Sequence, residues 1–188
     1  SLPKNSGTVI VKHANPCGVS IKKNHLESYK SAFACDPVSA FGGIVSCNFK
    51  ITKLLALELS KLFIEVIIAN NFDSNALKIL KKKKNLRLID ASNYKVNDGL
   101  KHVSLNHEIL IQSEDLKKFT SKNLKIVSKR KPTSKEMKNL IFAFNVCRYV
   151  KSNAIVLAAN ETTVGIGSGQ PSRLDSCKIA IDKMKKFT

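Results

Sequence analysis

Short apolar segments rich in β-branched residues alternate with segments of helical spacing through the first half of the chain. The spacing predicts strands and helices in turn, at residues 8–12 (strand), 25–35 (helix), 44–47 (strand), 52–63 (helix), 65–69 (strand), 74–80 (helix) and 86–91 (strand). Because strands that alternate with helices of about ten residues are typical of βαβ units, this pattern predicts an α/β fold with a mainly parallel sheet.

The second half of the chain has a weaker pattern. Residues 100–103 and 108–112 are predicted to be strands with no long helix between them. The basic segment 124–135 lacks hydrophobic periodicity, so we place a boundary there. Residues 1–131 would form most of a first lobe and 132–188 the beginning of a second. The predicted elements of the second lobe are a helix at 135–150 capped by Thr133 or Ser134, strands at 154–159 and 162–166, and a helix from about Ser172.

A formal net charge of +18 raises the question of nucleic-acid binding, because basic surfaces release counterions from polyphosphate. The basic residues are 28 Lys and only 4 Arg, and 16 Asn accompany them. Proteins that read phosphates or bases through bidentate geometry use Arg in particular, and a coding bias toward Lys and Asn accounts for the charge equally well. A basic RNA- or DNA-binding module therefore stays as the alternative hypothesis, with no specific nucleic-acid partner expected.

The apolar segments and the cysteines indicate the cellular location of the protein. No segment approaches the roughly 20 apolar residues of a membrane span, and the first twenty residues lack a signal-peptide pattern. Five scattered cysteines without a Cys-x-x-Cys pair are typical of reduced thiols. We expect a cytoplasmic protein without a membrane partner.

The first segment with candidate chemistry is Lys12-His13-Ala14-Asn15-Pro16-Cys17-Gly18. It predicts a buried strand that enters a tight turn at 15–18 and delivers polar groups to the carboxyl edge of the sheet. Lys12 and His13 on one strand would point to opposite faces, but a turn that begins at His13 could bring both into one cleft. An imidazole can then accept a proton while an ammonium stabilises an oxyanion. A purely structural role remains open for such a pair taken alone.

The dipeptide Pro16-Cys17 is also found in the Pro-Cys-x-x-Cys motif of zinc deaminases. Position 20 is Ser20 rather than a second cysteine, and no His-x-Glu precedes it. Because the three-ligand set is incomplete, the sequence predicts a site without zinc, and we assign no metal-ligating residues.

Two glycine-containing segments are further candidates. The segment 36–43, Asp-Pro-Val-Ser-Ala-Phe-Gly-Gly, follows a predicted helix, and its glycines would let a ligand approach the backbone, although ordinary turn chemistry also accounts for them. Residues 165–173, Gly-Ile-Gly-Ser-Gly-Gln-Pro-Ser-Arg, lie between a strand and a helix. This loop could hold an anion beside Arg173, but it matches neither the dinucleotide fingerprint nor a P-loop.

Six segments occur in the order seen in one enzyme family. They are residues 12–18, 36–43, 64–69 (Ile-Glu-Val-Ile-Ile-Ala), 109–112 (Ile-Leu-Ile-Gln), 151–156 (Lys-Ser-Asn-Ala-Ile-Val) and 165–173. Together they resemble AICAR transformylase, the formyltransferase half of a bifunctional enzyme of purine synthesis. The resemblance covers nearly the whole chain.

The resemblance implies an α/β fold with cytidine-deaminase-like lobes, a mixed sheet flanked by helices, and no zinc. It implies transfer of a formyl group from 10-formyltetrahydrofolate to the 5-amino group of AICAR. His13 would accept the proton and Lys12 would stabilise the transition state. Asn153 would orient the imidazole and the substrate carboxamide.

The resemblance also assigns substrate-binding residues. Gly42 and Glu65 fall where the family contacts AICAR, although some members have Asp at the position of Glu65. Arg173 would hold AICAR, Leu174 would lie against the folate, and Phe41 would form a wall.

The family's Arg-Tyr-Gly-x-Asn-Pro and Phe-Pro-Phe-x-Asp segments would precede Ser1 and follow Thr188. We therefore expect a fragment that is inactive by itself. Its parent would be a homodimer that also carries IMP cyclohydrolase activity and, as in some members, a structural alkali ion.

Overall fold

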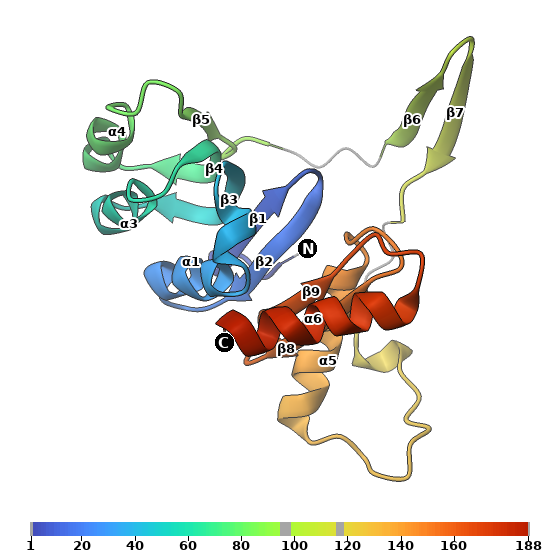
Figure 1. Cartoon of the computed structure of the whole chain (residues 1–188). Coiled ribbons are helices and arrows are strands. Elements are labelled where there is room, and N and C mark those ends of the chain that lie inside the picture. The colour runs from blue at the N-terminus through green and yellow to red at the C-terminus, as the bar shows by residue number, and fades with distance from the viewer. Residues whose placement is uncertain (1, 95–98, 116–118, 188) are drawn as a thin grey trace.

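The computed structural model describes residues 2–94, 99–115 and 119–187. Within these residues, one seven-stranded sheet has helices on both faces, and a separate two-stranded hairpin stands away from it (Figure 1). In spatial order the strands of the large sheet are β5 (Arg87–Asp90), β4 (Ile64–Phe72), β3 (Gly43–Ile51), β1 (Gly7–Lys12), β2 (Asn15–Ile21), β9 (Thr162–Gly167) and β8 (Ile155–Ala159).

The sheet is mixed and flanked by helices, which confirms the α/β fold with a mixed sheet that the resemblance implies; the mainly parallel sheet predicted from the alternation alone is wrong. Strands β3, β4 and β5 run parallel, as the alternating pattern predicts. The pairs β1–β2, β1–β3, β2–β9 and β8–β9 are all antiparallel. The prediction fails because β2 follows β1 directly through a hairpin, which reverses the chain without a crossover helix.

The turn of this hairpin lies at His13 and Ala14, and not at 15–18 as predicted. Both residues have positive φ, 49° and 60°. Two successive residues of positive φ match the right-handed twist of the strands in a two-residue hairpin. Asn15 therefore already pairs with Lys12, and the segment expected to turn forms strand β2. A register shift in the β1–β2 pairing, where Val11 opposes Pro16, accommodates the proline.

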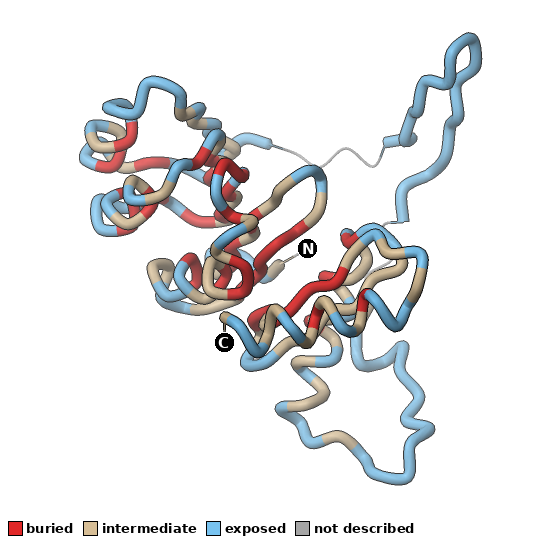
Figure 2. Tube along the Cα trace, viewed as in Figure 1, coloured by how far each residue is buried: buried red, intermediate tan, exposed pale blue. Residues whose placement is uncertain are grey.

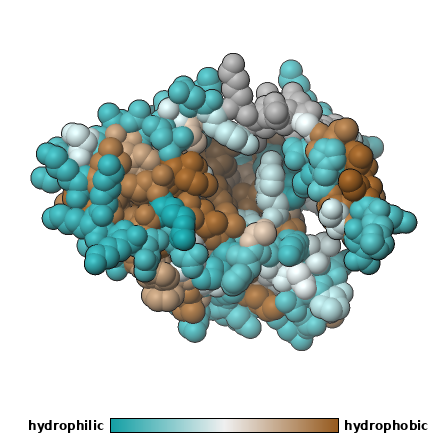
Figure 3. Space-filling view, turned by 90° about the horizontal axis from the view of Figure 1, so that it is seen from above, coloured by the Kyte–Doolittle hydropathy of each residue, from teal (hydrophilic) through white to brown (hydrophobic). Residues whose placement is uncertain are grey.

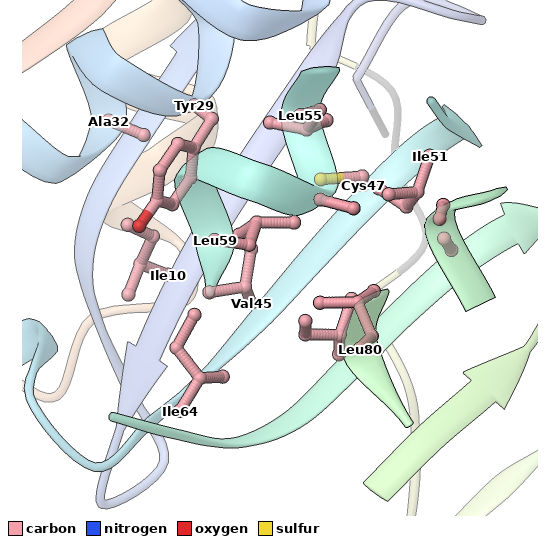
Figure 4. Packing of buried hydrophobic residues seen from close by; sticks show 14 of the residues in the cluster. Ile10, Tyr29, Ala32, Val45, Cys47, Ile51, Leu55, Leu59, Ile64 and Leu80 are labelled. Atoms are coloured by element: carbon pink, nitrogen blue, oxygen red, sulfur yellow. The ribbon is translucent and has the colours of Figure 1, made fainter. Parts of the chain in front are cut away.

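The first hydrophobic core lies between β1, β3 and β4 and the helices on one face of the sheet. These helices are α1 (His25–Ala34), α2 (Pro37–Ala40), α3 (Lys53–Leu59) and α4 (Ser74–Leu80), and they begin at the capping side chains of Asn24, Asp36, Thr52 and Asp73. Fully buried Ile10, Val45, Ile51, Leu55 and Leu80 join the sheet to the helices (Figure 4). Helix α3 ends at Leu59, four residues before its predicted end, because β4 begins at Ile64 and the chain must first turn back.

A second core joins the last strands to α5 (Ser134–Cys147) and to β2. Val19, Phe142, Val146 and Ile166 are buried within it. Helix α5 begins with a capping box between Thr133 and Glu136 and packs on β8, on the face opposite α1.

Residues 132–188 thus extend the same sheet, since β9 pairs with β2 and the hydroxyls of Ser20 and Thr162 are 2.8 Å apart. The lobe boundary near residue 131 stays a prediction.

Helix α6 (Arg173–Phe187) lies beside α1 on the first face. The helices approach the strands so closely that only glycine fits beneath them. A Cβ at Gly18 would lie 1.9 Å from the carbonyl oxygen of Ala32, and one at Gly167 would lie 1.9 Å from that of Ser176.

The separate hairpin consists of β6 (Leu100–Leu105) and β7 (Glu108–Ser113), close to the predicted strands. All of its residues are exposed, whereas buried residues are concentrated in the large sheet and its helices (Figure 2). A 3₁₀ turn, η1 (Ser121–Asn123), precedes α5.

We expect Gly167→Ala to lower the free energy of unfolding by about 3 kcal/mol or more, because the methyl group overlaps backbone that cannot swing away. Urea denaturation would measure the loss. Gly99→Ala is the matched control, since a Cβ there meets nothing within 4 Å. Equal stability of the two variants would contradict the close packing of α6.

The buried Asp36 carboxylate joins α2 to the last turns of α6. It accepts a hydrogen bond from Lys183 Nζ at 2.6 Å and another from the Ser39 hydroxyl at 2.6 Å. Burial by itself raises the pKa of Asp36, but these hydrogen bonds outweigh it, and the pKa lies below its ordinary 3.8. The pKa of Asp36 is lower in the folded protein than in the unfolded chain. The ionised carboxylate therefore stabilises the fold fully above about pH 3.8, and this stabilisation is lost as the pH falls through the folded pKa.

We therefore expect Asp36→Asn to be less stable than wild type at pH 6 and the difference to shrink toward pH 2.5, because protonation removes the same charge from the wild type. Asn keeps the capping function, so the difference reports the ion pair. Unfolding free energies from urea titrations at a series of pH values would measure it. Asp182→Asn, an exposed carboxyl on α6, should show no such convergence. A pH-independent difference for Asp36→Asn would contradict the linkage.

Candidate active site

The residues predicted for the site all lie at one edge of the large sheet. Lys12 ends β1, His13 follows it in the turn, and Asn153 precedes β8. Phe41 and Gly42 precede β3, and Glu65 is the second residue of β4, while Arg173 follows the loop that leaves β9. Strands β1 and β9 run antiparallel to β3, β4 and β8, and they end where those three strands begin. The site is therefore at the amino edge of the parallel strands, and its predicted position at their carboxyl edge is wrong.

Lys12 is held by the backbone before β3. Its ammonium donates to the carbonyl oxygens of Phe41 at 2.7 Å and Gly42 at 2.9 Å. Gly42 has a φ of +64°, and a Cβ there would lie 3.0 Å from the ammonium nitrogen. Glycine is therefore needed both for the backbone conformation and for the approach of Lys12. An ammonium has three donors, so two fix its position and the third can point at a developing oxyanion.

The Phe41–Gly42 segment is itself anchored to the residue before β4. The Gly42 N–H donates to the Phe63 carbonyl at 2.8 Å. The rings of Phe41 and Phe63 pack with centroids 5.3 Å apart. Phe41 nevertheless remains 59% exposed, which leaves its ring available as a wall for a ligand.

His13 is exposed in the β1–β2 turn, while the side chain of Lys12 reaches sideways toward β3. Because His13 lies in the turn after β1, its side chain does not have to point to the opposite face from Lys12, as it would within a strand. Whether the two side chains share one substrate cleft remains a prediction.

Asn15 connects this turn to the segment before β8, a role that the sequence did not reveal. Its Oδ1 accepts from the backbone N–H of Lys151 at 3.0 Å, and its Nδ2 donates to the His13 carbonyl at 3.4 Å. The sequence motif at residues 12–18 contains Asn15, but the partner of Asn15, Lys151, is 136 residues away in the chain.

Asn153 fixes the glycine loop that precedes α6. Its Nδ2 donates to the carbonyls of Gln170 at 3.0 Å and Pro171 at 2.7 Å. Its backbone carbonyl accepts from the Ser176 hydroxyl at 2.6 Å. Both amide hydrogens are thus used by the loop, so any role in orienting an imidazole or a carboxamide falls to Oδ1 as an acceptor.

The remaining predicted residues are exposed and face solvent from the same edge. Arg173 and Leu174 begin α6, where Leu174 is 72% exposed, and Glu65 is exposed on β4. Because Asn153 holds the Gln170–Pro171 segment that leads to Arg173, it positions Arg173 indirectly. No hydrogen bond among the described residues joins His13 to Asn153.

Cys17 is buried, and its burial disfavours the thiolate form. Burial, with a further contribution from Asp36, raises the pKa of its thiol to about 12. Among residues 2–94, 99–115 and 119–187, no group of three or more His, Cys, Asp or Glu side chains is arranged to hold a metal ion. The zinc-free site stays a prediction.

The model of the family described as AICARFT/IMPCHase bienzyme matches residues 2–183. The chain belongs to this family. Its relatives include bifunctional purine biosynthesis proteins PurH. That of Rhodospirillum rubrum is 49% identical over 91% of the chain, and that of Aquifex aeolicus is 45% identical over 99%. The PurH of Parvibaculum lavamentivorans is 47% identical over 93% of the chain.

The AICARFT/IMPCHase chain described here spans about a third of the length of these relatives, between 33% and 36%. None of the helices in its described residues combines the length and the apolar character that crossing a membrane requires.

We expect Asn15→Ala to increase amide hydrogen exchange at Lys151 at least about tenfold, because the amide loses its acceptor and the turn loses its connection to β8. Exchange followed by NMR or mass spectrometry would measure the change. Asn93→Ala is the control, since exposed Asn93 follows β5 at the opposite edge of the sheet. Unchanged protection of Lys151 would show that Asn15 does not hold this segment.

Proposed function

We propose that this chain contributes part of the site at which its parent transfers a formyl group from 10-formyltetrahydrofolate to AICAR. Family membership supports this proposal, and so does the arrangement at one sheet edge of a fixed ammonium, an exposed imidazole and the loop that carries Arg173. The attached cyclohydrolase activity, cytidine-deaminase-like lobes, a homodimer, a cytoplasmic location and a structural alkali ion are proposed for the parent on the resemblance alone.

In the proposed reaction the 5-amino group of AICAR attacks the formyl carbon. A carbon–nitrogen bond forms to AICAR, the bond to N10 of the folate breaks, and N10 gains a proton. The amine is deactivated by its ring, so it needs a base to remove its proton as the new bond forms. His13 is assigned this role. Lys12 is assigned to the oxyanion that develops on the formyl oxygen, because two backbone carbonyls hold its charge in place before the reaction.

Substrate positioning is assigned to exposed side chains around these two groups. Arg173 would donate a pair of hydrogen bonds to AICAR, and Leu174 would pack on the folate. Phe41, Gly42 and Glu65 would line the AICAR side. Positioning of this kind can supply roughly 7 to 11 kcal/mol of the barrier reduction in well-oriented reactions.

A basic nucleic-acid-binding module remains the alternative. Only the net charge of +18 favours it, and charge supports salt-dependent binding without sequence preference. Family membership favours the transferase.

In the full-length parent, we expect His13→Ala to lower kcat by roughly 10² to 10⁴ while the affinity for AICAR stays within about twofold, because proton transfer occurs only during the reaction. Arg173→Ala should instead raise the Kd for AICAR, since its contact exists before chemistry begins. Steady-state kinetics and calorimetric titration with AICAR would separate the two effects.

The matched control for a lysine variant is Lys82→Ala, an exposed position after α4, which should keep full activity while Lys12→Ala loses it. Lys12→Arg should rescue poorly because a planar fork cannot occupy the place of a compact ammonium between two carbonyls. Full activity of His13→Ala would refute the assignment of the base. The 188-residue chain by itself is expected to show no turnover.

A further inference from the structure

The ammonium of Lys12 depends on a short segment of backbone for its position. Its two acceptors are the carbonyls of Phe41 and Gly42, which follow helix α2. Helix α2 has four residues, and a helix of about one turn does not hold its shape in water by itself. The contacts that attach this segment to the rest of the protein therefore decide where the two carbonyls lie.

The segment is attached at both of its ends. At its last residue, the Gly42 N–H donates to the Phe63 carbonyl at 2.8 Å. Its first residue, Asp36, is buried, and the carboxylate accepts from the Ser39 N–H at 2.9 Å and from the Ser39 hydroxyl at 2.6 Å. These two hydrogen bonds shape the turn from within. The hydrogen bond from Lys183 Nζ, at 2.6 Å, instead attaches the turn to α6.

The Lys183–Asp36 ion pair is buried, unlike a second ion pair of the same helix. Hydrophilic side chains occupy much of the rim of the molecule in the view from above (Figure 3). Lys178 and Asp175 form a surface pair at 3.9 Å, in which both side chains are more than half exposed. In the Lys183–Asp36 pair, the side chains are only 33% and 3% exposed. A surface pair contributes little to holding a structure, whereas loss of one partner from a buried pair leaves an uncompensated charge.

Lys183 supplies the charge that balances the Asp36 carboxylate. The thiols of Cys17 and Cys35 also interact with this carboxylate, but burial raises their pKa values to about 12 and about 11, so they are neutral near pH 7. Burial raises the pKa of Asp36 as well, and the hydrogen bond from Lys183 is the largest of the effects that lower it. Without Lys183, the carboxylate must take up a proton or move toward water. Such a move would displace the start of α2.

Helix α6 is a firm support for Lys183. Its backbone at Ala180 packs so closely on β9 that no Cβ fits at Gly165. Ala180 is fully buried and lies about one turn before Lys183. The same helix thus begins at Arg173 and, near its end, holds the turn that precedes the acceptors of Lys12.

We propose that Lys183 is a positioning residue of the transfer reaction, because its ion pair with Asp36 fixes α2 and therefore the two carbonyls that hold the Lys12 ammonium. The inference rests on the proposed function, in which Lys12 stabilises the oxyanion. Lys183 acts there through Asp36 and the backbone of α2. A small displacement of the ammonium is costly, since a misplacement of about 1 Å can lower a rate about 10²-fold.

The first test is the kinetics of the full-length parent. We expect Lys183→Met to lower kcat at least about tenfold while the Kd for AICAR stays within about twofold, because the oxyanion forms only during the reaction. Lys183→Arg keeps the pair with Asp36, so its kcat should stay within about threefold of wild type. Lys185→Met, at an exposed lysine near the same end of α6, is the matched control and should keep full activity. Equal kcat values for Lys183→Met and the control would overturn the proposal.

The second test asks whether Lys183 acts through Lys12. In a Lys12→Ala background, adding Lys183→Met should change kcat by less than about twofold, because the ammonium that Lys183 positions is already absent. A purely structural role would lower kcat by the same factor in both backgrounds, and that outcome would contradict the proposal. If Lys183→Met does not fold, the double variant Asp36→Asn/Lys183→Met takes its place. It leaves no unpaired buried charge but still lacks the link to α6, so the same loss of kcat is expected.

The third test does not use activity and so separates this inference from the proposed function. Hydrogen exchange of the backbone amides of residues 38–42, followed by mass spectrometry of the parent, should rise at least about tenfold in Lys183→Met and stay unchanged in Lys185→Met. Exchange in α4 should not change, which excludes a general loss of stability. With faster exchange and a fully active Lys12→Ala, the proposed role of Lys12 fails while the anchoring of α2 by Lys183 stands. Unchanged exchange in Lys183→Met overturns this inference and leaves the proposed function intact.

Discussion

The two-residue turn at His13 and Ala14 is the constraint on which the arrangement of the sheet and the site depends. It returns the chain directly into β2, so that β1 becomes a central strand flanked by two antiparallel neighbours. That reversal brings the end of β1 to the same edge as the starts of β3, β4 and β8. It also frees His13 from strand geometry while Lys12, one residue earlier, remains fixed.

Backbone groups, more than side chains, hold the candidate site in place. Carbonyls of Phe41 and Gly42 fix Lys12, and carbonyls of Gln170 and Pro171 fix Asn153. Backbone acceptors on anchored segments lose little entropy when they bind, which suits a site that must hold charge before its substrate arrives. Helix α6 packs closely on Gly167, and this contact fixes the start of the helix, where Arg173 lies.

Membership of the AICARFT/IMPCHase family and the geometry of the edge support one another without being the same observation. Family membership suggests which chemistry to look for, and the edge supplies a fixed ammonium at Lys12 together with the exposed side chains of His13 and Arg173. The structure also has an open groove beside β1 and β2 and an exposed apolar hairpin, β6–β7.

The sequence by itself determined the features that depend on neighbours a few residues apart. Helices α1 and α4 and the strands around Asn160-Glu161 follow from periodicity. The sequence limits the cap of α5 to Thr133 or Ser134, and the structure has Thr133. The tertiary structure alone decided the direction of β2, because His13 and Ala14 adopt positive φ without the Gly or Asn that normally signals such a turn. It also decided the pairing of Asn15 with Lys151 and of Asp36 with Lys183, since partners more than 130 residues apart meet only when the sheet forms, and no local pattern records that meeting.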